Sequence, residues 1–400
     1  MTALESGPAQ VDRKHDIYPG LDTMRAVGAL GVLVTHTTFW AGFYQSGLLG
    51  SMASRLDIGV AIFFVLSGFL LGRPFLAAMA DDRRAPRAGR YLWKRFLRIM
   101  PLYIVTVTVA LAALPDNRGV GWLAWLRTLT LTQIYPGGEL VAGLTHMWSL
   151  CVEVGFYLAL PLLMWLLRRT AGRRGWRIEA ILIALAVAAL GGWMWIALVS
   201  PRVEGSALWP PAYSAWFAAG IALAAITIEL RRPGGREFTT FVGLAQQPGV
   251  CWSIAAALFA VAATPLAGPV LLLEPTATEA VTKNVLYVII AVLILLPSIL
   301  GHRNRSTYDN LLGARPLRHL GVISYGIFCL HLIVIQAVTV WLDLPLFQGH
   351  GWQLFGITVV GAVLLAELAY RVVERPAMRL RNIGSAPIPT TTPTASSTNH

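Results

Sequence analysis

The chain has 400 residues, of which 56% are hydrophobic and only 13% are charged. Soluble domains carry about 25% charged residues, so this composition excludes an ordinary soluble domain and indicates a multi-pass protein of the cell membrane. The net charge of +12 would suit a nucleic-acid partner, but no arginine-rich stripe with interleaved aromatic residues occurs, so we expect no nucleic acid among the partners.

Ten apolar segments are long enough to cross the lipid bilayer as helices, which takes about 17–25 residues each. They lie at 23–44, 57–79, 99–114, 145–167, 178–199, 212–230, 249–268, 283–301, 319–342 and 352–373. A further apolar run at 121–135 is short and carries Trp122 and Trp125, so it either lies at the interface or forms an additional span. The predicted fold is an all-α polytopic membrane protein with about ten transmembrane helices.

The distribution of basic residues predicts the orientation of these helices. With both termini in the cytosol, 27 of the 32 lysines and arginines fall on the cytosolic side. The other five, on the outer side, are Arg55, Arg118, Arg127, Arg202 and Lys283. This split follows the positive-inside rule. The predicted domains are a cytosolic segment at 1–22, a transmembrane domain at 23–373 and a cytosolic tail at 374–400, largely disordered because Ser, Thr and Pro dominate its end.

The first span carries two ionisable residues inside an otherwise apolar stretch. Arg25 lies near its cytosolic start, and His36 follows eleven residues later. At a rise of about 1.5 Å per residue, His36 lies about 16 Å deeper in the membrane than Arg25. An ionisable side chain at that depth is energetically costly, so a functional role is the default hypothesis for His36.

Two more ionisable residues are predicted at the same depth. Glu153 in the fourth span and His331 in the ninth both lie about 18 Å from the cytosolic surface, close to the level of His36. Grouped around a polar cavity, the three side chains would satisfy one another. The alternatives are that His331 is a hydrogen-bonded core histidine and that Glu153 is a structural partner inside the bundle.

A second layer, nearer the cytosol, is cationic. Its members are Arg25, Arg73, Arg95 and Arg98, each within a turn or two of the predicted surface. Guanidinium groups bind phosphate through paired hydrogen bonds and stay charged. The layer therefore predicts a cytosolic ligand with several phosphates whose reactive end reaches the membrane centre, a shape that acyl-coenzyme A has. The alternative is that these arginines only set the topology and extend to lipid head groups.

Ordered motifs along the chain resemble those of the acyltransferase 3 family of integral membrane enzymes. They lie at 21–26 with His36, at 59–70, 95–98, 146–157 and 323–331, and at 374–376. Val154 departs from the pattern, because a second acidic residue often follows Glu153 in the family. The stretch 178–300 carries no motif. The resemblance implies transfer of an acyl group, often acetyl, from a cytosolic donor to a hydroxyl of a carbohydrate, lipid or related acceptor at the membrane.

The hypothesis that follows is an O-acyltransferase with acyl-coenzyme A, in particular acetyl-coenzyme A, as donor. His36 is the predicted general base, or it forms an acyl-histidine intermediate. Glu153 is expected to orient His36, and Tyr157, one turn further, to donate to the oxyanion or the acceptor. The predicted cavity walls are Trp148, Ser149, Tyr325 and His331.

A transporter or flippase for a glycolipid is the alternative function, because buried charges also suit a proton-coupled carrier. The lack of an internal repeat and the arginine layer favour the enzyme. The three cysteines, Cys151, Cys251 and Cys329, show no metal-binding spacing, and no other residue group calls for a metal.

Overall fold

The computed structural model describes residues 18–170, 175–270, 273–301 and 307–382. Within these ranges every regular element is helical, which confirms the predicted all-α class. The longer helices are α1 (Pro19–Trp40), α3 (Gly59–Ala80), α4 (Ala88–Ala113), α6 (Trp148–Thr170), α7 (Ile178–Met194), α8 (Ser214–Glu229), α10 (Pro248–Ala262), α11 (Ala277–Leu300), α13 (Arg315–Trp341) and α14 (Gly351–Ala369). Shorter ones are α2 (Gly47–Ser54), α5 (Trp122–Leu129), α9 (Thr239–Ala245), α12 (Thr307–Leu312) and α15 (Arg375–Arg379).

Eight helical segments of the described chain are long and apolar enough to cross a membrane, or nine if the bent pair α9–α10 forms one span. The chain is therefore a multi-pass membrane protein, as predicted. The first predicted span corresponds to α1, which has 22 residues but does not reach that apolarity, because Arg25, His36 and several threonines interrupt it. The run 121–135 does not span, because α5 has only 8 residues and about 12 Å of length.

The predicted domain boundaries lie partly outside the described residues, which leave out 1–17 and 383–400. The boundaries stay predictions. Helix α14 continues through a π-helical turn, Tyr370–Glu374, into α15, so the first residues of the predicted tail are helical. The cytosolic location of both termini stays a prediction.

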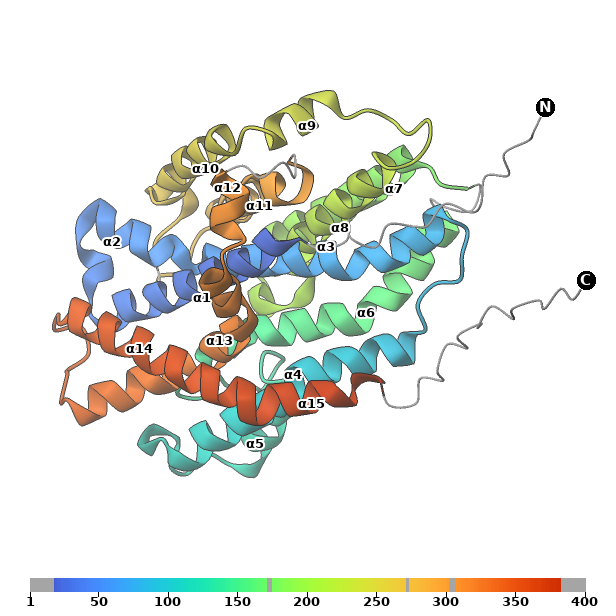
Figure 1. The fold of residues 1–400 in the computed structure, drawn as a ribbon. Coiled ribbons are helices and arrows are strands. Elements are labelled where there is room, and N and C mark those ends of the chain that lie inside the picture. Colours follow the sequence, from blue (N-terminus) through green and yellow to red (C-terminus); the bar gives the residue numbers. More distant parts are fainter. Residues whose placement is uncertain (1–17, 171–174, 271–272, 302–306, 383–400) are drawn as a thin grey trace, which may run out of the picture.

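Helices α1 and α3 form the centre of the bundle (Figure 1). Helix α1 packs on α3 and α13, and α13 packs on α14; on the other side α3 packs on α8, and α8 on α7. A Cβ atom at Gly68 would overlap the carbonyl oxygen of Phe217, and one at Gly220 would overlap that of Val65. Glycine at both positions thus lets α3 and α8 cross in backbone contact, as small residues do in membrane bundles.

Stacked aromatic rings fill the space beside that crossing. Phe217 on α8 lies between Phe64 on α3 and Phe156 on α6, with ring centroids 4.5 and 4.0 Å away. Such a stack buries a large apolar area and holds α3, α6 and α8 in a defined relative position. Two motifs, 59–70 and 146–157, are thereby held against each other, and their polar residues face a common space.

Candidate active site

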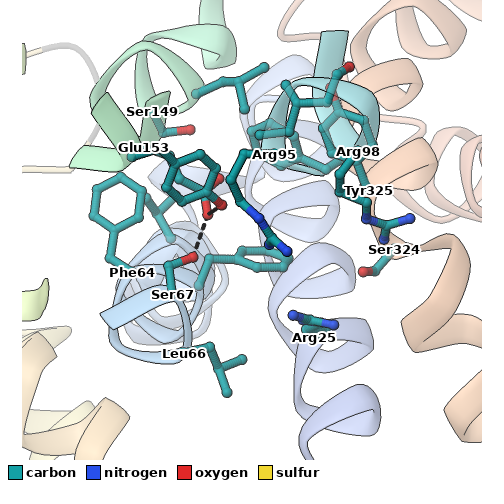
Figure 2. A pocket seen from close by; sticks show the side chains of 16 residues that line it. Arg25, Phe64, Leu66, Ser67, Arg95, Arg98, Ser149, Glu153, Ser324 and Tyr325 are labelled. Atoms are coloured by element: carbon teal, nitrogen blue, oxygen red, sulfur yellow. Dashed lines mark hydrogen bonds between the residues drawn. The ribbon is translucent and has the colours of Figure 1, made fainter. Parts of the chain in front are cut away.

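Three arginines and one glutamate meet in a small cavity between five helices, shown in Figure 2. Its volume is about 90 Å³. The lining residues are Arg25, Val60, Phe63, Phe64, Leu66, Ser67, Arg95, Arg98, Ile99, Ser149, Leu150, Glu153, Tyr157, Ser324, Tyr325 and Phe328. They come from α1, α3, α4, α6 and α13, so segments more than 250 residues apart in the chain build one site.

Helical spacing explains why pairs of these residues share a wall. Arg95 and Arg98 are three residues apart on α4, and Glu153 and Tyr157 are four apart on α6, the separations that place side chains on one helix face. The eleven-residue step from Arg25 to His36 is slightly more than three full turns, so both side chains project from the same face of α1.

Glu153 is held by two hydroxyl groups. Its Oε1 atom accepts hydrogen bonds from Ser67 Oγ at 2.5 Å and from the Tyr157 hydroxyl at 2.6 Å (Figure 2 shows the first). The hydrogen bonds to this carboxylate thus come from Ser67 and Tyr157, and the orientation of His36 by Glu153 stays a prediction. Ser67 was missed as a site residue, although it lies inside the motif at 59–70.

Arg98 forms an ion pair with the buried Glu374, and this pair connects two motifs. Its Nη1 donates to Glu374 Oε2 at 2.7 Å, and Nη2 donates to the Val322 carbonyl at 3.3 Å. Glu374 is 1% exposed, and the guanidinium lies 5.9 Å from the Tyr325 ring centroid. The Glu374 carboxylate therefore neutralises part of the Arg98 charge, which leaves less of it for a ligand. Glu374 was not predicted as a site residue, although the motif at 374–376 contains it.

A wider basic pocket adjoins the cavity at its arginine end. This entrance pocket has a volume of about 560 Å³. It is lined by Asp22, Arg25, Lys94, Arg95, Leu97, Arg98, Val322, Met378 and Arg381. Arg25, Arg95 and Arg98 line both spaces, so the two are adjacent along the same three side chains. Five basic side chains and one acid make the entrance pocket suited to an anion with several charges.

Three histidines cluster on the far side of the cavity wall. His331 Nε2 lies 3.1 Å from His36 Nδ1, and the His146 ring centroid lies 4.6 Å from that of His331 and 5.9 Å from that of His36. Phe328, which lines the cavity, has its ring centroid 4.9 Å from that of His146. His36 and His331 thus pair as their common depth predicted. His146 was not predicted as a site residue, although it opens the motif at 146–157; it lies in a single helical turn, Thr145–Met147, before α6.

The hydrogen bonds of the pair assign its tautomers. His331 Nδ1 lies 2.7 Å from the Phe328 carbonyl, so it carries the hydrogen and leaves Nε2 with a lone pair. His36 Nδ1 lies 2.9 Å from the Val32 carbonyl and faces His331 Nε2, so it also carries a hydrogen. His36 Nε2 is then the nitrogen with a free lone pair, which is what a general base requires. By contrast, both ring nitrogens of His146 are buried without a hydrogen-bond partner among the described residues.

The remaining predicted residues divide into two groups. Ser149 and Tyr325 line the cavity, and their roles as substrate contacts stay predictions. Arg73 and Trp148 line neither the cavity nor the entrance pocket: the Arg73 guanidinium lies 5.3 Å from the Tyr18 ring centroid, and the Trp148 ring packs 5.2 Å from that of Tyr213. Position along the sequence does not tell which way a helix face points, and the roles predicted for Arg73 and Trp148 stay predictions. Among the described residues, no group of three or more His, Cys, Asp or Glu side chains is arranged to hold a metal ion.

Comparison with known proteins identifies the family. A family model described as an acyltransferase domain, acyltransferase 3, matches residues 18–371. The chain belongs to the acyltransferase 3 family. It is 28% identical to nodulation protein 10 of Rhizobium leguminosarum bv. viciae, over 90% of this chain and 93% of the relative. It is also 28% identical to acyltransferase MdmB of Streptomyces mycarofaciens, over 93% of this chain and 96% of the relative.

A longer relative is the peptidoglycan O-acetyltransferase OatA of Listeria monocytogenes, 24% identical over 90% of this chain and 55% of the relative. No solved structure matches the chain. The family match and the apolar helices together make this acyltransferase 3 protein a multi-pass membrane enzyme that transfers acyl groups.

Proposed function

We propose that this enzyme transfers an acyl group from acyl-coenzyme A to a hydroxyl of a carbohydrate, glycolipid or related acceptor at the membrane. Acetyl is the acyl group that we propose. The observation that carries the proposal is the shared lining of the entrance pocket and the cavity by Arg25, Arg95 and Arg98, next to a histidine pair with one free lone pair. Acetyl is favoured because a relative's name specifies O-acetyl transfer.

The entrance pocket is the proposed site for the phosphates of coenzyme A. Arg25, Arg95 and Lys94 present donors there, while Arg98 is partly neutralised by Glu374. Guanidinium–phosphate contacts are charge-assisted and geometrically specific, so Arg25 and Arg95 are expected to contribute most to donor affinity. The pantetheine arm then extends from the entrance pocket into the cavity, toward the histidines.

The proposed reaction uses His36 as the base. His36 Nε2 takes the proton from the acceptor hydroxyl while the oxygen attacks the thioester carbonyl. The carbon–sulfur bond breaks, the coenzyme A thiolate leaves, and the imidazolium returns its proton to that thiolate. His331 positions His36 by accepting from its Nδ1–H group, which keeps the lone pair on Nε2. The variant in which His36 itself carries the acyl group follows the same geometry.

Glu153 has a different proposed role from the one that the sequence indicated. Its carboxylate binds the Tyr157 and Ser67 hydroxyl groups and places both on the cavity surface. A hydroxyl held in this way presents its oxygen in a fixed position, so Tyr157 and Ser67 are suited to align the donor arm. Glu153 is therefore a positioning residue in this proposal.

The test uses purified enzyme in lipid nanodiscs with radiolabelled acetyl-coenzyme A. We expect release of free coenzyme A, with the acetyl group transferred to co-purified acceptor or to water, and His36→Ala should abolish this release while coenzyme A still binds. A transporter or flippase would leave the thioester intact in both proteins, and that result would refute the proposal. The acceptor is then sought by mass profiling of glycans and lipids from cells with and without the gene, as a lost ester mass.

A further inference from the structure

An apolar groove between α4 and α6 adjoins the cavity from the side of the bundle. Its volume is about 440 Å³. Trp93, Phe96 and Leu158 form its outer rim, and all three are exposed apolar side chains on helices that cross the membrane. Leu158, in the middle of α6, is placed to face hydrocarbon, whereas Trp93 lies near the start of α4, where its Nε1 donates to the Leu380 carbonyl at 3.3 Å. The groove is thus placed to open sideways to the lipid bilayer, close to one membrane surface.

The inner end of the groove coincides with one wall of the cavity. Arg95, Ile99 and Tyr157 line both spaces. Arg95 also lines the entrance pocket, so it lies where all three spaces meet. Its Nε atom is buried and has no hydrogen-bond partner among the described residues. A buried donor without a partner is costly, which points to an oxygen of a ligand as its missing acceptor.

We propose that the groove holds the hydrocarbon chain of an acceptor dissolved in the bilayer, whose polar head enters the cavity beside Arg95 and Tyr157. The inference rests on the proposed function and assigns its acceptor to the class of amphiphiles with a hydroxyl-bearing head. An apolar groove that ends at a guanidinium and a phenol matches a molecule with a long chain and an oxygen-rich head. With lateral entry, the polar head of the acceptor does not have to cross the apolar interior of the helix bundle separately from its chain.

The donor's own acyl chain is a less suitable occupant. The donor is proposed to arrive through the entrance pocket, where the basic residues lie, and its acyl group is the part that must reach His36. The groove leaves the cavity at Arg95 and Tyr157 and opens toward lipid. A ligand that arrives from water does not need an opening toward lipid. Charge and position thus separate a route for an anionic soluble donor from a route for a bilayer-dissolved acceptor.

The experiment uses a photoactivatable fatty alcohol that carries a diazirine on its chain, in phosphatidylglycerol nanodiscs without any donor. Leu158→Trp fills the groove rim, and Leu162→Trp is the matched control: the two leucines lie one turn apart on α6, with 63% and 64% exposure, but Leu162 does not line the groove. Leu92→Trp narrows the groove from α4 and is the second test variant.

Cross-links mapped by mass spectrometry should fall on the groove segments of α4 and α6 in the unaltered enzyme and in Leu162→Trp. Labelling should drop at least fivefold in Leu158→Trp and Leu92→Trp. Equal labelling of test and control variants, or labels that map elsewhere, would overturn the proposal. In a separate competition experiment, displacement of the label by palmitoyl-coenzyme A but not by coenzyme A would assign the groove to the donor chain instead, and would equally overturn the proposal. Because no donor is present in the labelling step, its outcome is independent of whether acetyl transfer is observed.

Discussion

Removing Arg98 is the most informative single change, because it separates a role in the fold from a role in donor binding. Arg98→Met leaves the Glu374 carboxylate buried and unpaired, with the side chain 1% exposed. Breaking a buried ion pair by removing one partner costs about 3–5 kcal/mol. Since the Arg98 side chain is 24% exposed and partly solvated, the lower end, about 3 kcal/mol, applies.

That loss of stability is measurable as a shift of the unfolding temperature. With an unfolding entropy of about 2 cal/mol/K per residue, a loss of about 3 kcal/mol lowers the Tm of a chain of this length by roughly 4 °C. The assay heats detergent-solubilised protein and follows the monodisperse fraction by size-exclusion chromatography. Glu374→Gln should lower the Tm less than Arg98→Met does, because the amide keeps an acceptor for Arg98 and the buried negative charge is removed.

The double variant Arg98→Met/Glu374→Leu decides between the roles. An apolar pair of similar volume should restore most of the lost stability, because replacing a buried ion pair with packed apolar groups is often neutral. Coenzyme A affinity of this stable double variant should fall less than tenfold. If Arg98→Met leaves the Tm within 1 °C, or if the double variant is no more stable than the single one, the structural role assigned to this ion pair is wrong.

Further predictions concern catalysis and the donor site. His36→Ala should lower the transfer rate by roughly 10²–10⁴-fold, and more than about a tenth of the original turnover in well-folded protein would contradict the general-base role. His331→Phe should lower kcat without changing coenzyme A affinity, and His331→Gln, which keeps an acceptor for His36, should recover part of the rate. Arg95→Ala should weaken coenzyme A binding about ten- to a hundredfold, measured by titration calorimetry, whereas Arg83→Ala should not. Tyr157→Phe keeps the ring but loses its hydroxyl, so steady-state kinetics should show a raised KM for acetyl-coenzyme A.

The fold class and part of the site could be predicted from the sequence for one physical reason. In a bilayer every backbone polar group must be satisfied within its own segment, so apolar segments of sufficient length must be helices. Helical geometry then places Arg25 and His36 on one face of α1 at a known separation, and the depths of Glu153 and His331 follow from counting residues. These predictions depend on the geometry of single helices and do not require knowledge of any contact between helices.

What only the tertiary structure decided is which side chains meet. Depth does not give the rotation of a helix about its axis, so His36 pairs with His331 while Glu153, at a similar predicted depth, binds Ser67 and Tyr157. The packing of α3, α6 and α8 through Gly68, Gly220 and a stack of phenylalanine rings sets that rotation. Contacts such as these join residues far apart in the chain, and the periodicity of one helix carries no information about the face that its neighbour presents.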